Sequence, residues 1–488
     1  MKHYSIYQIL GVIFLLAACT ETESLFPDTA TDNSPINIEV IDNGFAGEGL
    51  QTRAQEVGYT TVFTTGDRIG IIGTGANNVP YRYDGNKWVA EESVTLSKPS
   101  TYSTYYPYSE EWDGMTIEQI KTNFQPQADQ STYANYTASD LMTATGVWNS
   151  GELLRFNMQH ECAMLILIPH QRKYTYQGEE WYCNERIFDG AFSIEGSQYK
   201  AWGDDEGYIR LLIQKTTAEK NVRYFYSRNG TERLNGEVSV ETLSTGQFRR
   251  VITNQNVETY EYNHYDAAVG DFLVRADNSM GYFFVRQEEG FYPHECIGIV
   301  FKVGAGQDDD INDYAGTGLS GSIRGYAVAL RDAHSGAGAW GIRDVDEPDL
   351  ENVSSPNGKY NGYTSTKAIR QLPRYSSTNV NTPTANGQYW AFKVASEYSA
   401  PALANSSGWY LPSINQLMDI HALSLNEKFV LAGGEAFKST NDGRYWSSTE
   451  LNNYDAWFFR FVNGSPEAYA KSNDSYLRPS YVRAVITF

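Results

Sequence analysis

Short runs in which apolar and polar residues alternate recur along the chain, and they predict β-strands. The runs Ile36 to Ile41, Arg68 to Ile72 and Phe156 to His160 alternate in this way. Near the end, Tyr481 to Phe488 has the pattern typical of a closing strand with one buried face. Turn residues such as Gly, Asn and Asp separate the runs, so we expect antiparallel β structure over most of the chain.

Helical periodicity is limited to a few segments near the C-terminus. A short strand is expected at Trp409 to Leu411, followed by a helix that starts at Ser413 and repeats apolar residues every three or four positions from Ile414. Two further helices are expected at Thr366 to Leu372 and Gln388 to Tyr398. The chain shows no repeat of fixed period.

Composition supports a β-rich fold and excludes one class of partner. The 488 residues include 36 Tyr and 42 Gly, which is typical of strands joined by many turns. The net charge is -21 and the isoelectric point is near 4.8. Binding to nucleic acid needs clustered Lys and Arg to neutralise phosphates, so a nucleic-acid partner is not expected.

The N-terminus has the pattern of a signal peptide. Lys2 precedes an apolar run from Ile9 to Leu16, which is too short to span a membrane. The run ends in Leu-Ala-Ala-Cys, which resembles a bacterial lipobox, and that resemblance makes Cys19 the lipidated first residue of an outer-membrane precursor. Ordinary secretion is the alternative. Residues 20–35 form a polar tether.

The segment after the tether resembles the fimbrillins, the pilus subunits of the Bacteroidales. The match rests on several separated pieces that appear in the family's order: Phe63 to Gly73, Val79 to Ala90, Ser103 to Ser109, Ala138 to Ala144 and Leu154 to Ile168. It implies an N-terminal β-sandwich over residues 54–170. Residues 171–265 are expected to form a second β-sandwich, where the resemblance is vaguer and rests on the closing strand GQFRRVI.

The fimbrillin resemblance also implies a mode of assembly. A protease cuts the precursor after an Arg, and here Arg53 and Ala54 match the cleavage position. Residues 20–53 would then leave with their strand, whose inward side chains are Ile36, Ile38 and Val40. A strand from a stalk fimbrillin would fill the groove by β-augmentation. The alternative is a monomer that keeps this strand.

The last part of the chain resembles the C-type-lectin-like, FISUMP-type domains of Bacteroides-group surface proteins. The motifs are WYLPS, YWSSTE and the terminal VRAV, with further matches at Val269 to Phe284, Cys296 to Gly304 and Gly325 to Ala333. The resemblance covers residues 266–488 and implies a mixed α+β domain that presents variable loops for recognition. The expected fold is therefore mainly β, with two fimbrillin-like β-sandwiches followed by a C-type-lectin-like domain.

Polar and aromatic residues between the last strands are candidates for binding a glycan or protein ligand, because sugars stack on aromatic faces and hydrogen-bond to amides and carboxylates. The alternative is that these are ordinary hairpin-loop residues. The candidates are Asn452, Asn453, Tyr454, Asp455, Tyr469, Asn473, Asp474 and Tyr476.

Two acidic segments contain residue types that bind calcium, but neither has the full sequence pattern of a known calcium motif. Asp308, Asp310 and Asn312 occupy alternate positions, yet an EF-hand needs Gly where Asp313 stands and Glu where Leu319 stands. The fragment from Glu347 through Pro348 to Asp349 is the nearest approach to a lectin calcium motif. We therefore expect solvated loops, with no metal and no cofactor.

No catalytic arrangement is evident in the sequence. The seven histidines lie in separate segments without an HExxH motif, and Asp332 and His334 have no recognisable Ser partner. Formylglycine-generating enzymes share the lectin-like fold, but the cysteine pair that they use is not identifiable. An envelope enzyme of that type, depending on Cys296 or His334, stays as a third alternative, and a binding role is expected.

Three cysteines remain after the signal region, at positions 162, 183 and 296. No CxxC or Cys/His spacing occurs, so a structural zinc site is not expected. A disulfide between Cys162 and Cys183 is one interpretation, and three buried thiols are the other.

The position of the last predicted strand suggests the role of the chain. Stalk fimbrillins donate their C-terminal strand, but here Tyr481 to Phe488 closes a further domain. The sequence therefore predicts a tip adhesin at the cell surface, which accepts a stalk subunit's strand and binds a host or bacterial surface glycan or protein. The alternative is a non-polymerising lectin-like lipoprotein of the outer membrane.

Overall fold

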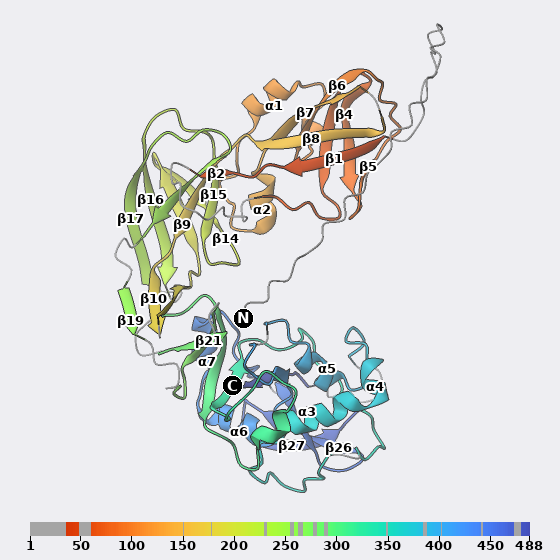
Figure 1. The fold of residues 1–488 in the computed structure, drawn as a ribbon, viewed down its shortest axis with the longest axis vertical. Coiled ribbons are helices and arrows are strands. Elements are labelled where there is room, and N and C mark those ends of the chain that lie inside the picture. Colours follow the sequence, from red (N-terminus) through yellow and green to blue (C-terminus); the bar gives the residue numbers. More distant parts are fainter. Residues whose placement is uncertain are drawn as a thin grey trace, which may run out of the picture.

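The computed structural model describes residues 36–47, 60–149, 151–176, 178–228, 232–253, 258–261, 267–276, 281–286, 291–347, 350–383, 388–401, 403–440, 443–472 and 480–488. They form a mainly β chain in three lobes (Figure 1): an orange N-terminal lobe, a yellow-green middle lobe and a cyan-to-blue C-terminal lobe. None of the helices in these ranges is long and apolar enough to cross a membrane.

The N-terminal lobe is a seven-stranded sheet wrapped around one apolar cluster. In β8, the side chains of Leu154, Phe156 and Met158 are fully buried while their neighbours are exposed, as the alternation predicts. The two edges of the sheet, β1 and β5, lie near each other (Figure 1). In spatial order the strands are β1 (Asn37–Asp42), β8 (Leu153–His160), β7 (Met142–Trp148), β6 (Ser100–Tyr106), β3 (Arg68–Gly73), β4 (Ala76–Tyr83) and β5 (Trp88–Ala90).

The middle lobe is a sandwich of two sheets whose inner faces share one apolar cluster. The first sheet contains β13 (Ser197–Lys200), β12 (Gly190–Ile194), β16 (Lys220–Arg228) and β17 (Glu232–Val240). The second contains β14 (Trp202–Gly203), β15 (Ile209–Ile213), β9 (Ala163–Ile168), β18 (Gln247–Ile252) and β2 (Ala46–Gly47). The strand β2 comes from the N-terminal segment that also supplies β1.

Strand β9 is buried on both faces and differs from expectation in its location. Leu165 and Leu167 face the sandwich core, whereas Met164 and Ile166 face a second cluster between the lobes. That cluster also takes residues from α1 (Ile117–Asn123), a short helix that opens with a capping box. The expected boundary at residue 170 placed this strand in the first domain, but its pairing with β15 and β18 puts it in the middle lobe.

A small sheet links the middle lobe to the C-terminal lobe. It contains β11 (Glu179–Asn184), β10 (Gln171–Tyr176) and β19 (Glu258–Glu261). Tyr174, Trp181 and Cys183 from this sheet pack into a core cluster of the C-terminal lobe. The expected second domain of residues 171–265 is thus divided between the middle sandwich and this linking sheet.

The C-terminal lobe is mixed α+β and has apolar cores on both faces of its larger sheet. In spatial order that sheet contains β21 (Tyr282–Val285), β20 (Phe272–Arg275), β22 (Cys296–Val303), β23 (Gly325–Ala329), β28 (Val485–Thr487) and β24 (Trp409–Tyr410). A smaller sheet contains β25 (Arg444–Glu450), β26 (Asp455–Arg460) and β27 (Ser465–Ala470). The helices around them are α3 (Gly362–Gln371), α4 (Pro373–Ser376), α5 (Trp390–Ser396), α6 (Ile414–Ala422) and α7 (Asn426–Leu431).

Local sequence accounts for the start of α6, which was predicted at Ser413. The Ser413 side chain accepts from the backbone N–H of Gln416, and the Gln416 side chain accepts from the backbone N–H of Ser413. The predicted closing strand is shorter than expected, because only Val485–Thr487 pairs as a strand. Its C-terminal neighbour Phe488 is nevertheless fully buried.

Candidate functional site

Within the part of the chain that the structure describes, strand β1 lies at the edge of the N-terminal sheet and has a strand partner on one side only. It runs parallel to β8, with Ile38 opposite Leu154 and Val40 opposite Phe156. The inward residues of this segment are Ile36, just before the strand, and Ile38 and Val40 within it, and among them only Ile38 is strongly buried, at 7% exposed. An edge strand with one buried side chain is the least firmly held kind of strand in a sheet.

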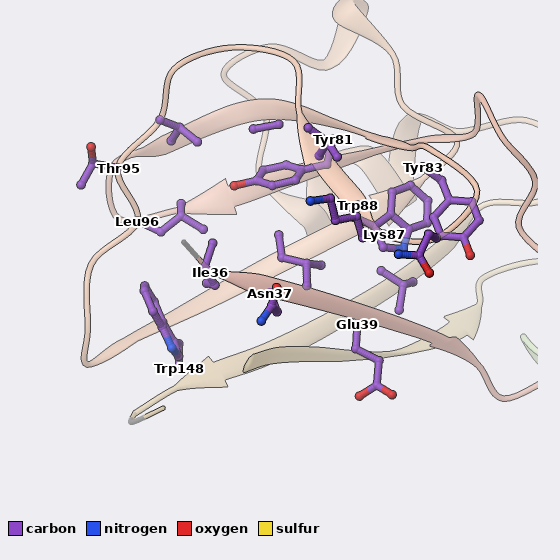
Figure 2. A pocket seen from close by; sticks show the side chains of 16 residues that line it. Ile36, Asn37, Glu39, Tyr81, Tyr83, Lys87, Trp88, Thr95, Leu96 and Trp148 are labelled. Atoms are coloured by element: carbon purple, nitrogen blue, oxygen red, sulfur yellow. The ribbon is translucent and has the colours of Figure 1, made fainter. Parts of the chain in front are cut away.

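Beside β1 the lobe is open as a groove. The groove has a volume of about 900 Å³ and separates β1 from β5 and the loop after it. Figure 2 shows Tyr81, Trp88 and Leu96 on one wall, with Ile36 and Trp148 near one end. The walls combine apolar side chains with polar groups such as Asn86, Lys87 and Thr95, so an extended segment that alternates apolar and polar side chains fits them.

The exposed hydrogen bond and ion pair of β1 contribute little to holding the strand. The Asn37 backbone N–H donates to the Glu152 carbonyl at 2.6 Å, and the Arg155 guanidinium pairs with the Glu39 carboxylate at 2.5 Å. The side chains of Arg155 and Glu39 are 54% and 40% exposed. Exposed ion pairs typically contribute less than about 1 kcal/mol, so this pair does not fix the strand.

The C-terminal end of β1 makes a buried ionic contact. The Asp42 carboxylate lies 3.0 Å from His160 Nε2, and His160 Nδ1 lies 2.8 Å from the Asp140 carboxylate. All three side chains are less than a tenth exposed. The Phe45 ring stacks on the imidazole with 3.8 Å between ring centroids. The imidazole is thus enclosed by two carboxylates and one aromatic ring.

Opposing effects set the protonation of this group. Burial alone would lower the pKa of His160, but Asp140 and Asp42 outweigh it and raise that pKa to about 9. For Asp42, burial favours a higher pKa, but His160 and the backbone N–H groups of Thr61 and Gly44 lower it below its ordinary value. At neutral pH the contact is therefore an imidazolium between carboxylates.

The segment continues from this contact into the middle lobe. Ala46 and Gly47, which form β2, pair in parallel with Gln247 and Phe248 of β18. The Ala46 backbone N–H also donates to the Gly246 carbonyl at 2.7 Å. One short segment therefore contacts both lobes, and its removal would expose an edge on each of them.

Strand β28, near the other end of the chain, is held in the interior of a sheet. It pairs with β23 on one side and with β24 on the other. Beyond it, the Phe488 carbonyl accepts from the backbone N–H of Arg324 at 2.8 Å. Phe488 also packs against the rings of Tyr282 and Phe284. Strand β28 is not available to another molecule without opening this lobe.

The structure brings five of the candidate ligand residues together. Asn452, Asn453 and Tyr454 lie in the turn before β26, which begins at Asp455, and Tyr469 on β27 pairs with Ala456. The Asn452 side-chain oxygen accepts from the backbone N–H groups of Tyr454 and Asp455, as hairpin turns often do. Tyr454 is 46% exposed. The other candidates, Asn473, Asp474 and Tyr476, lie outside the described residues.

Below this turn lies a buried ionic cluster that the sequence analysis missed. The Lys471 ammonium pairs with the Glu450 carboxylate, and both side chains are fully buried. The Glu450 carboxylate also lies 3.4 Å from the Glu347 backbone N–H. Burial raises the pKa of Glu450 to about 7, although Lys471 acts in the opposite direction. The cluster connects the loop at residues 345–347 to β25 and supports the turn from beneath.

The acidic loop has internal partners in place of a metal. Asp310 caps the short helical turn Ile311–Tyr314, and its carboxylate accepts from the Asn312 side chain. The Asp309 carboxylate accepts from the hydroxyls of Tyr314 and Tyr326. Within the described ranges, no group of three or more His, Cys, Asp or Glu side chains is arranged to hold a metal ion.

The other residues considered for catalysis also have structural partners. The Asp332 carboxylate pairs with the buried Arg483 guanidinium at 2.8 Å. The His334 ring accepts from the Gly336 backbone N–H at 2.9 Å. Asp332 and His334 therefore do not form a hydrogen-bonded pair with each other in the way a catalytic dyad would.

The cysteines correct one interpretation of the sequence. All three described cysteines are buried free thiols. Cys162 lies in the cluster between the first two lobes, whereas Cys183 and Cys296 lie in a core of the C-terminal lobe. The disulfide between Cys162 and Cys183 is therefore wrong, because the two side chains belong to different cores. The positions Cys19, Arg53 and Ala54 lie outside the described residues.

Comparison with known proteins finds family models that match two parts of the chain. Residues 52–201 match the family model of fimbrillin-like proteins. This part of the chain is therefore fimbrillin-like. Residues 360–483 match a second family model, the Lcl C-terminal domain.

Two similar proteins come from Bacteroides ovatus. The chain is 23% identical to a protein of Bacteroides ovatus that is named as a candidate fimbrium tip subunit, Fim1C, over 94% of this chain and 95% of that protein. A crystal structure of a fimbrial protein from Bacteroides ovatus has a TM-score of 0.44 and 18% identity, and the match covers 93% of this chain and 99% of that one.

Proposed function

We propose that this chain is the tip subunit of a fimbrium and that it joins the fimbrium by protease-triggered strand exchange. The main support for the proposal is that the first described strand pairs on one side and the last described strand pairs on both sides. Strand β1 lies at an edge beside an open groove, whereas β28 is enclosed between two strands. A subunit of this kind accepts a strand from a neighbour without giving up β28. The similarity to Fim1C, named as a candidate fimbrium tip subunit, supports the same role.

The exchange begins with cleavage between Arg53 and Ala54, which separates β1 and β2 from the rest of the chain. Their departure exposes the backbone edge of β8 and apolar side chains of the groove such as Tyr81, Trp88 and Leu96. Each apolar side chain that a new strand buries there contributes about 1.5–3 kcal/mol. A strand from a stalk fimbrillin supplies these contacts and the missing edge hydrogen bonds.

Before assembly, the precursor is anchored to the outer membrane through a lipid on Cys19. After assembly, the C-terminal lobe is displayed at the cell surface and binds a glycan or protein. The turn at residues 452–455, together with Tyr469, is the proposed contact surface, because the buried cluster beneath it holds it in place. The role is binding and not catalysis.

N-terminal sequencing of protein from sheared surface filaments and from membranes tests the proposal. We expect the filament fraction to begin at Ala54, and immunogold labelling of the C-terminal lobe to mark filament ends. Protein found only in membranes and beginning at a lipidated Cys19 would instead favour the non-polymerising lectin-like lipoprotein.

A further inference from the structure

Cleavage after Arg53 leaves part of the Asp42 binding site behind. The His160 imidazole and Asp140 belong to the remaining chain, and so does Thr61, whose backbone N–H donates to the Asp42 carboxylate. Asp42 and Phe45 leave with β1. Two donors, His160 Nε2 and the Thr61 N–H, are then left where the two carboxylate oxygens of Asp42 had been.

The remaining site selects for one kind of side chain. His160 is 3% exposed, is the last residue of β8, and stacks on Phe45, which packs against the cluster between the first two lobes. A buried donor that loses its acceptor destabilises the protein by about 1–3 kcal/mol, and by more when it is charged. A carboxylate forms an ion pair with the charged imidazole and accepts from the Thr61 N–H, whereas a neutral amide carries no charge to pair with the imidazole.

We propose that His160 and Thr61 form a carboxylate-binding socket that selects the incoming strand of the stalk subunit. The strand that fits presents apolar side chains along the groove, where Ile36, Ile38 and Val40 lie in the precursor. At the socket it presents an Asp or Glu, and its next residues supply an aromatic ring against His160. This inference rests on the proposed strand exchange, and it adds the chemistry by which one donor strand is preferred over others.

Strand β1 itself supplies a probe with known contacts. Residues 49–54 of the full chain are replaced by a specific protease site, and the chain is cleaved in the presence of labelled peptides of residues 36–47. One peptide has the native sequence, one carries Asp42→Asn, and one carries Glu39→Gln. The last is the matched control, because Glu39 makes only an exposed ion pair. Retention of each peptide is measured by gel filtration and by competition.

The socket predicts that Asp42→Asn weakens peptide binding by about 10- to 100-fold, because a hydrogen bond to a charged group contributes about 1.5–3 kcal/mol. The Glu39→Gln peptide should bind within about threefold of the native one. In a chain carrying His160→Gln, the native and Asp42→Asn peptides should bind about equally.

If the native and Asp42→Asn peptides bind equally to the otherwise unchanged chain, the proposed carboxylate-binding socket is wrong. Strand exchange itself is not contradicted by that result. That comparison decides the question even if the His160→Gln chain does not fold. If no peptide replaces β1, not even the native one, both the proposed strand exchange and the proposed socket are contradicted.

Discussion

The first and last described strands of this chain are held in opposite ways. Strand β1 pairs on one side, buries mainly Ile38, and depends on the ionic contact of Asp42 at its end. Strand β28 pairs on both sides, all of its residues are buried, and Phe488 after it is fully enclosed. This difference is the basis of the proposal that β1 is exchanged for a neighbour's strand while β28 stays in place.

The largest effect is expected at the enclosed end. Phe488→Ala removes a fully buried ring and should destabilise the C-terminal lobe by about 3–5 kcal/mol, lowering its unfolding temperature by about 10 °C. Differential scanning calorimetry measures the change. Val462→Ala, at a residue 43% exposed in the same lobe, is the control and should stay within about 0.5 kcal/mol. If the Phe488→Ala variant is as stable as this control variant, the burial of Phe488 does not stabilise the C-terminal lobe.

In β1, Ile38→Ala removes the most buried apolar side chain of the strand. We expect a smaller loss, about 2 kcal/mol, because an edge strand relaxes more easily around the missing atoms. The loss should appear as faster amide exchange in β1 and the facing edge of β8, measured by mass spectrometry. Equal acceleration in β28 would contradict the separation of the two ends.

In the intact chain, Asp42→Asn should loosen β1 by about 1–3 kcal/mol without affecting the C-terminal lobe. Amide exchange of β1 is again the measurement, and Glu39→Gln is the matched control with an expected effect below about 1 kcal/mol. If both substitutions have the same effect, the buried contact contributes no more than the exposed one.

The smallest expected effect is a dependence on pH. Because Asp140 and, to a smaller extent, Asp42 raise the pKa of His160, the contact contributes fully below the ordinary His pKa near 6.5 and is lost as pH rises through about 9. The Asp42 pKa is lowered, so its carboxylate stays charged throughout this range. Release of the labelled native peptide from the cleaved chain should therefore be faster at pH 9 than at pH 6.5, by up to about tenfold. A His160→Gln chain should lose this dependence, and an unchanged rate in the native chain would argue against the ionic contact.

The sequence carries information about some of these features and not about others. Alternation in β8 and the capping residues of α6 are local signals, so both elements were predictable. The run at Ala163–Ile168 is apolar on every side, and such a pattern does not reveal which sheet a strand joins. This is why the boundary expected at residue 170 differs from the structure.

The buried contacts were beyond sequence reasoning for a different reason. The strand pattern placed His160 on the inward face of β8, but Asp42 and Asp140 come from distant segments that only the folded sheet brings together. The cluster of Glu347, Glu450 and Lys471 likewise joins separate loops. Polar residues far apart in the chain give no periodic signal, so contacts of this kind have to be seen in three dimensions.

The central claim is that β1 must leave before the chain enters a fimbrium, and a reversible crosslink tests it directly. Glu39 and Arg155 are register partners on the exposed face of β1 and β8, so the pair Glu39→Cys and Arg155→Cys should tie the two strands together. Thr101 and Val147, exposed partners on β6 and β7, provide a control pair in the same lobe that leaves β1 unrestrained.

The measurement is the amount of each double variant in sheared filaments, before and after cells are treated with a mild reductant. The account predicts that the crosslink between β1 and β8 abolishes incorporation, that reduction restores it, and that the control crosslink has no effect. Normal incorporation of the chain with β1 locked to β8 would contradict the account.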